Sequence, residues 1–100
     1  MSVIVIGRMT VDPAAVEKLW AERKADFQAV AHDAKAVGAI HHRWGFAEGT
    51  VVIIDEWPDA ASFQKFFASQ ATIPQLMQAA GVQGPPEFEF LDAQAGPDEF

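Results

Sequence analysis

The sequence contains no cysteine, no tyrosine and no asparagine. Without cysteine the chain forms no disulfide and has no thiolate chemistry, which fits a reducing compartment, so we expect a cytoplasmic protein. Basic residues are few: seven Lys and Arg stand against fourteen Asp and Glu, giving a formal net charge of −7. An acidic surface repels phosphate groups, so neither nucleic acid nor an anionic membrane is an expected partner.

Long hydrophobic runs are also missing. No stretch approaches the ~18 consecutive apolar residues of a membrane span, and the N-terminus lacks the basic segment and apolar run of a signal peptide. Half of the 100 residues are nevertheless hydrophobic and 21% are charged, which is typical of a globular protein. We assign residues 1–91 to a single domain and residues 92–100, which are acidic and contain Gly and Pro, to a loose C-terminal tail.

Periodicity and capping signals predict alternating strands and helices. The expected elements are a strand over Val3–Met9, a helix over Pro13–Val37 capped by Asp12, a hairpin within Gly38–Trp57 with its turn at Ala47–Thr50, a helix from an Asp59 cap to a break near Ala71, a short helix capped by Thr72 and ending at Ala80, a loop over Val82–Pro86, and a strand over Glu87–Leu91.

This order predicts an α+β, ferredoxin-like βαββαβ fold with an antiparallel sheet. Both helical segments would cover one face of the sheet. Val and Ile recur on both faces of the first and third strands, so the other face is too apolar for water. Burial stabilises by about 25 cal/mol per Å², and the economical cover is a second copy. We therefore expect a homodimer joined through the sheet face.

The hairpin holds the main candidate site. With an even number of loop residues, His42 lies opposite Asp55 and Trp44 opposite Ile53, on the face assigned to the helices. His41 and Glu56 then pair on the opposite face, where we expect polar groups of the dimer contact. Because neighbouring strand residues point to opposite faces, His41 and His42 cannot chelate one metal, and no metal site is expected.

His42 and Asp55 are the candidate catalytic pair. A carboxylate beside an imidazole fixes its tautomer and supports it as a general base. Such a pair in an aromatic pocket could remove a proton from a phenol or from a carbon next to a carbonyl. The alternative is a hydrogen-bonded pair that only ties two strands together. The candidate substrate-binding residues around the pair are Arg23, Trp20, Trp44, Trp57, Phe63, Phe66 and Phe67.

Two parts of that set have structural alternatives. Arg23 falls on the apolar stripe of the first helix, between Trp20 and Phe27. It is either an inward cation for an anionic group or a snorkelling side chain with a solvated head. The phenylalanine stripe of the second helix is either core or, in part, cavity lining.

Residues Ile53–Phe63, Ile-Ile-Asp-Glu-Trp-Pro-Asp-Ala-Ala-Ser-Phe, together with the element order and the length, carry a family resemblance. The chain resembles the dimeric α+β barrel superfamily, among the antibiotic-biosynthesis-monooxygenase-like domains. That resemblance implies a site between helices and sheet. It also implies activities such as cofactor-free oxidation of polycyclic aromatics, haem degradation, lactone isomerisation or polyketide cyclisation.

The resemblance does not extend to all site residues. Quinone-forming members are described with Asn, Trp and Tyr in the pocket, and haem-degrading members with Asn, Trp and His, whereas this chain has neither Asn nor Tyr. The function we expect is a small cofactor-independent enzyme, monooxygenase- or isomerase-like, acting on an aromatic or polyketide-like molecule. The alternative is a non-catalytic dimeric domain, hydrophobic-ligand-binding or stress-associated.

Overall fold

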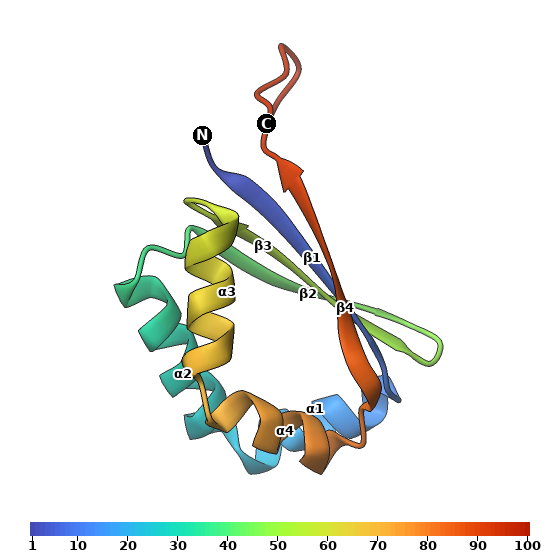
Figure 1. Ribbon diagram of the computed structural model, residues 1–100. Helices are drawn as coiled ribbons and strands as arrows, with labels where there is room; N and C mark the ends of the chain where they lie inside the picture. The colour runs from blue at the N-terminus through green and yellow to red at the C-terminus, as the bar shows by residue number, and fades with distance from the viewer.

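Four strands form one antiparallel sheet in the order β2-β3-β1-β4, and all the helices lie on one side of it (Figure 1). The computed structural model describes the whole chain, residues 1–100. Its elements are β1 Val3–Thr10, α1 Pro13–Glu22, α2 Lys24–Ala36, β2 His41–Ala47, β3 Thr50–Trp57, α3 Ala60–Ser69, α4 Thr72–Ala80 and β4 Gln83–Asp92. The predicted α+β, ferredoxin-like fold is confirmed. None of the four helices has the length and apolarity of a membrane span.

The hairpin that carries the candidate pair has the predicted register. His42 lies opposite Asp55, and Trp44 lies opposite Ile53. The strands end at Ala47 and restart at Thr50, which leaves an even loop. Gly49 has a φ of +68°, a left-handed conformation that glycine adopts without a steric cost.

The first predicted helix is wrong as a single element, because it breaks at Arg23. That residue leaves helical geometry, with φ −127° and ψ 38°, and separates α1 from α2. Its guanidinium Nε lies 2.7 Å from Asp26 Oδ2 in the first turn of α2. The break lets α1 and α2 follow different directions around the sheet (Figure 1). No Gly or Pro lies at this position to indicate the break in the sequence.

Two further boundaries differ from the prediction. Ala71, not Thr72, precedes the first helical residue of α4. The predicted loop over Val82–Pro86 belongs mostly to β4, which begins at Gln83. β4 is an edge strand, and an edge strand tolerates proline because one row of its N–H groups needs no partner. The caps at Asp12 and Asp59 are confirmed, since each carboxylate accepts a backbone N–H of the following helix.

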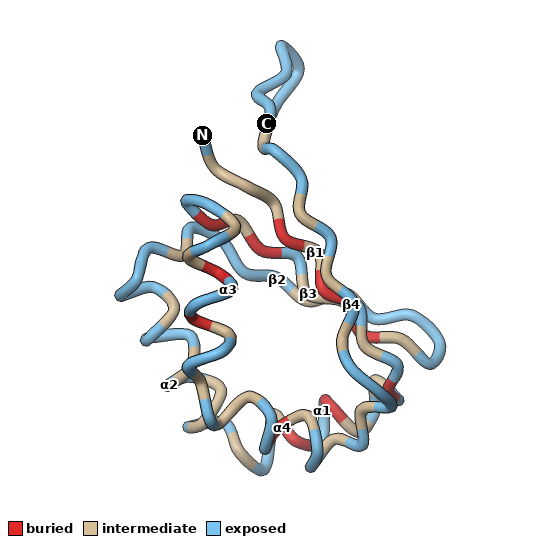
Figure 2. The backbone as a smooth tube through the Cα atoms, viewed as in Figure 1, coloured by how far each residue is buried: buried red, intermediate tan, exposed pale blue.

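The core is small and divided. One buried cluster joins Val5, Trp57, Phe63 and Phe66, and a second joins Val11, Val16 and Val51. Only 11 of the 100 residues are buried, and they are scattered in short segments around the space between sheet and helices (Figure 2). The two layers therefore do not pack directly against each other over much of their area, which leaves room for a cavity.

Candidate functional site

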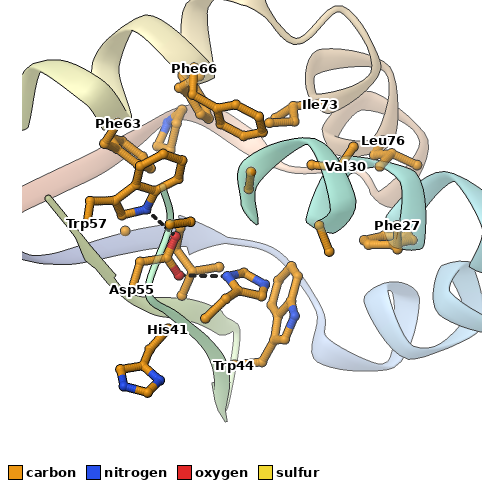
Figure 3. A pocket seen from close by; sticks show the side chains of 18 of the residues that line it. Phe27, Val30, His41, Trp44, Asp55, Trp57, Phe63, Phe66, Ile73 and Leu76 are labelled. Atoms are coloured by element: carbon orange, nitrogen blue, oxygen red, sulfur yellow. Dashed lines mark hydrogen bonds and ion pairs between the residues drawn. The ribbon is translucent and has the colours of Figure 1, made fainter. Parts of the chain in front are cut away.

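A cavity of about 650 Å³ lies between the sheet and the helices. Hydrophobic side chains make up 18 of its 25 lining residues. This size and lining are typical of a small-molecule site. Side chains from α2, α3 and α4 form the wall opposite the sheet, among them Phe27, Val30, Phe63, Phe66, Ile73 and Leu76 (Figure 3).

Strand register arranges the cavity floor in rows that cross the sheet. The His42 row consists of Phe90, Val5, Asp55 and His42, from β4, β1, β3 and β2 in turn. The neighbouring Gly7 row consists of Phe88, Gly7, Ile53 and Trp44. Because same-face residues are two apart along a strand, the rows lie roughly 7 Å apart. The polar pair of the floor is thus flanked by an apolar row on the same face.

Asp55 is the central polar group of the site. Its Oδ1 lies 2.6 Å from His42 Nδ1, and its Oδ2 accepts a hydrogen bond of 3.1 Å from Trp57 Nε1. Figure 3 draws both bonds of Asp55 as dashed lines. Asp55 is 6% exposed and Trp57 1%, whereas the His42 side chain is 44% exposed. A buried carboxylate with both oxygens engaged therefore holds an accessible imidazole.

This arrangement defines what His42 can do. When Nδ1 carries the proton and donates to Asp55, the lone pair of the neutral imidazole is on Nε2. Nε2 makes no hydrogen bond within the chain. A ring held in one orientation with a free Nε2 is suited to accept a proton from a bound molecule. No group of three or more His, Asp or Glu side chains is placed to hold a metal ion.

Tryptophans form the aromatic end of the cavity. The Trp44 ring lies edge-to-face with the His42 ring at 5.4 Å between centroids, and with the Trp20 ring at 5.3 Å. The Phe27 ring lies 6.3 Å from that of Trp44. Aromatic rings in this geometry provide a rigid apolar surface that matches a flat aromatic ligand.

All the predicted site residues except Arg23 line the cavity. Arg23 pairs instead with Asp26, and its side chain is 35% exposed, in keeping with the structural alternative. Phe63 and Phe66 are buried at 3% and 8% exposure, so they serve as core and as cavity wall together. The prediction missed Gly7, Phe27, Ile53 and Phe88, which also line the cavity.

The second polar pair from the sequence does not form. His41 and Glu56 are register partners on the outer face, but the Glu56 carboxylate accepts its hydrogen bond from the Ser2 hydroxyl. His41 makes no side-chain hydrogen bond to Glu56, and its ring points away from Asp55 (Figure 3), although the residue is part of the cavity lining. Only the His42 side of the hairpin therefore carries a linked polar group at the site.

Comparison with solved structures gives similar folds at low sequence identity. SnoaB, a cofactor-independent oxygenase from Streptomyces nogalater, is 21% identical over 98% of both chains, with a TM-score of 0.64. The ActVA-Orf6 monooxygenase from Streptomyces coelicolor, in complex with nanaomycin D, is 18% identical over 95% of this chain and 89% of that one, with a TM-score of 0.69.

A further antibiotic biosynthesis monooxygenase is 15% identical over 93% of this chain and 99% of that one, with a TM-score of 0.63. This chain has the fold of the antibiotic-biosynthesis-monooxygenase-like proteins. The sequence itself matches no protein-family model and no curated protein. The comparisons thus confirm the expected α+β fold.

Proposed function

We propose that this protein is a small cofactor-independent enzyme, monooxygenase- or isomerase-like, that acts on an aromatic or polyketide-like molecule. The observation that carries the proposal is the His42–Asp55 pair, joined at 2.6 Å, in an aromatic cavity of about 650 Å³. His42 is the general base in this proposal. Asp55 orients the imidazole, and Trp57 holds Asp55.

The oxygenase reaction needs only a base and a suitable substrate. His42 Nε2 takes a proton from an activated CH₂ of an electron-rich aromatic ketone, and the carbanion gives one electron to O₂. The resulting radical pair forms a C–O bond, and the peroxide regains the proton from His42. Loss of water then leaves C=O, so CH₂ and O₂ become C=O and H₂O. In an isomerase, the same proton would return to a different carbon.

Two of the structurally similar proteins support this choice of reaction. SnoaB is a cofactor-independent oxygenase, and the ActVA-Orf6 monooxygenase binds nanaomycin D. This chain lacks the Asn and Tyr expected of quinone-forming members. The proposal therefore assigns proton removal to His42, which the hairpin register brings to Asp55.

The test is turnover of a panel of hydroxylated polycyclic aromatics, followed by oxygen uptake and absorbance. Wild-type protein should consume O₂ with an oxygenase substrate, or change absorbance without O₂ uptake with an isomerase substrate. His42→Ala should lower the rate by about 10²–10⁴-fold, the usual contribution of a general base. His32→Ala is the matched control, because His32 is an exposed histidine of α2 that does not line the cavity. Full turnover by His42→Ala would refute the assigned base.

A second candidate function is binding without chemistry, which the missing Asn and Tyr favour. In that case the cavity holds a hydrophobic molecule and His42 supplies only a hydrogen bond. Quenching of tryptophan fluorescence measures binding, because Trp20, Trp44 and Trp57 line the cavity. Tight binding with unchanged ligand after prolonged incubation in air would support this function over catalysis.

We also propose that the outer sheet face joins two copies of the chain. Ile54 and Leu91 are each 41% exposed. Both residues belong to the face that the helices leave uncovered, together with Ile4, Ile6 and Val52. Exposed aliphatic side chains in adjacent strands form an apolar patch of the kind that an interface covers. The ion pair between Arg8 and Glu89 lies on the same face and would contribute polar contacts beside it.

A further inference from the structure

Gly7 directly follows the apolar run Val3–Ile6 near the start of the chain. It lies in β1, between Ile53 of β3 and Phe88 of β4. A Cβ atom built at Gly7 would lie 2.8 Å from Phe88 Cε1 and 2.9 Å from Ile53 Cγ1. Ordinary contacts between carbon atoms are about 3.5–4.0 Å, so both neighbours lean over Gly7 into space that any other residue would fill.

Phe88 has little freedom to move away from Gly7. Its ring lies edge-to-face with Phe63 at 5.1 Å and with Phe67 at 5.0 Å between centroids. Phe63 is buried and also contacts Trp57 and Phe90. A side chain at position 7 would have to push the Phe88 ring by about 0.7–1.2 Å. Because α3 blocks the way upward, we expect the ring to move sideways into the cavity.

Ile53 transmits the same change toward the candidate base. It lies opposite Trp44, whose ring contacts His42, and two residues before Asp55 on the same face. The Gly7 row is therefore one of the two rows that lie next to the His42 row. Since the two rows are roughly 7 Å apart, a fused-ring molecule lying over the Gly7 row reaches His42 with its edge.

We infer that Gly7 is a specificity-determining residue. Because Gly7 has no side chain, Phe88 and Ile53 can lie close to the sheet, and this leaves a slot beside His42 for a flat substrate of three fused rings. The inference deepens the proposed function and rests on it for the identity of the reacting group. It differs from a general role in folding, because it predicts a dependence on ligand size.

The experiment measures the Kd of a hydroxylated two-ring aromatic and a hydroxylated three-ring aromatic by tryptophan fluorescence. Gly7→Ala should raise the Kd of the three-ring probe by at least about tenfold, the usual effect of one methyl-sized change in a pocket. The Kd of the two-ring probe should change less than threefold. Gly45→Ala is the matched control. Gly45 is also a strand glycine, but its added Cβ would meet only Ile54 Cδ1, at 3.8 Å, so neither Kd should change.

Phe88→Leu provides the second arm. Combined with Gly7→Ala, it should restore three-ring binding to within about threefold of wild type, because the smaller side chain removes the clash. The single variant Phe88→Leu should improve the affinity for a four-ring probe relative to the three-ring probe. This measurement tests the inference even if Gly7→Ala does not fold. Equal losses for both probe sizes, no rescue, or no binding of the three-ring probe by wild type would overturn the inference. Size-dependent binding without turnover would instead overturn only the proposed catalysis.

Discussion

Trp57 and Asp55 lie two residues apart on β3, and the indole Nε1 of Trp57 donates a hydrogen bond of 3.1 Å to Asp55 Oδ2. Alternate residues of a strand share a face, which places both side chains on the cavity floor. The Trp57 ring is fixed from the other side by Phe63 and Phe66, at 5.5 and 5.3 Å between centroids. The aromatic core thus sets the orientation of the Asp55 carboxylate, and Oδ1 of that carboxylate in turn orients the His42 ring.

Trp57→Phe should separate this hydrogen bond from the packing of the ring. Phenylalanine keeps an aromatic ring against Phe63 and Phe66 but removes the donor, so Asp55 Oδ2 is left buried and unpaired. We expect a loss of about 1–3 kcal/mol in the free energy of unfolding, measured by urea denaturation, and a lower kcat. Ile73→Val, at another lining residue, is the control for a small change of volume. An unchanged kcat in a folded Trp57→Phe protein would show that Asp55 needs no such support.

Replacing His42 and Asp55 together tests whether the pair is structural. His42→Leu alone leaves a buried carboxylate oxygen without its partner and should cost about 1–3 kcal/mol. His42→Leu combined with Asp55→Leu removes the unpaired carboxylate but leaves the buried Trp57 Nε1 without its acceptor, so only part of that loss should be recovered. Both proteins should lack turnover, and thermal unfolding together with the oxygen-uptake assay checks both expectations. Turnover retained in the double variant would reduce the pair to a link between strands.

Asp59 gives a prediction for acid stability. Hydrogen bonds from the Ser62 side chain and backbone lower the pKa of the Asp59 carboxyl from its ordinary value of 3.8. A carboxyl with a lowered pKa in the folded state stabilises it above pH 3.8, and the contribution is lost as pH falls through the lowered value. Asp59→Asn keeps a capping oxygen but does not titrate. The Tm difference between wild type and Asp59→Asn should therefore shrink below pH 3.8, and a constant difference would contradict this role.

The hairpin shows what local sequence can specify. One face of β3 carries Asp55 and Trp57, and the other carries Ile54 and Glu56. A slip of one residue would move the charged and apolar groups to the wrong faces. With a two-residue loop and a glycine at position 49, only one register places the side chains of both strands on their correct faces. The His42–Asp55 contact was therefore predictable from the sequence alone.

The break at Arg23 shows the opposite case. Arginine is a good helix former, and the apolar stripe continues through Trp20 and Phe27. The break is set by tertiary structure, since α1 and α2 must turn to cover a twisted sheet. The one local signal is Asp26, whose carboxylate lies in the first turn of α2 and pairs with Arg23. An acidic residue at this spacing from an arginine is too common inside helices to mark an end without other evidence.

Gly7 is a position where the sequence supports a further structural prediction. A glycine inside a strand indicates close approach of another group. The run Val3–Ile6 was sufficient to predict a strand, and the glycine that follows it could also have indicated a neighbour in close contact. Which neighbour leans over it depends on the pairing of β1 with β3 and β4, and a strand does not specify its partners by itself. Phe88 and Ile53 could be assigned to the cavity only from the complete sheet.

Ile54→Glu tests the proposed homodimer. A stable interface covers about 800 Å² per partner, and a carboxylate in the middle of an apolar sheet face would have to be buried without a partner. Wild-type protein should therefore sediment as a dimer at micromolar concentration and Ile54→Glu as a monomer. Val37→Glu is the control: Val37 is 55% exposed but follows α2 on the side of the sheet that carries the helices. A wild-type protein that sediments as a single subunit would contradict the dimer, and two variants with equal effects would place the interface elsewhere.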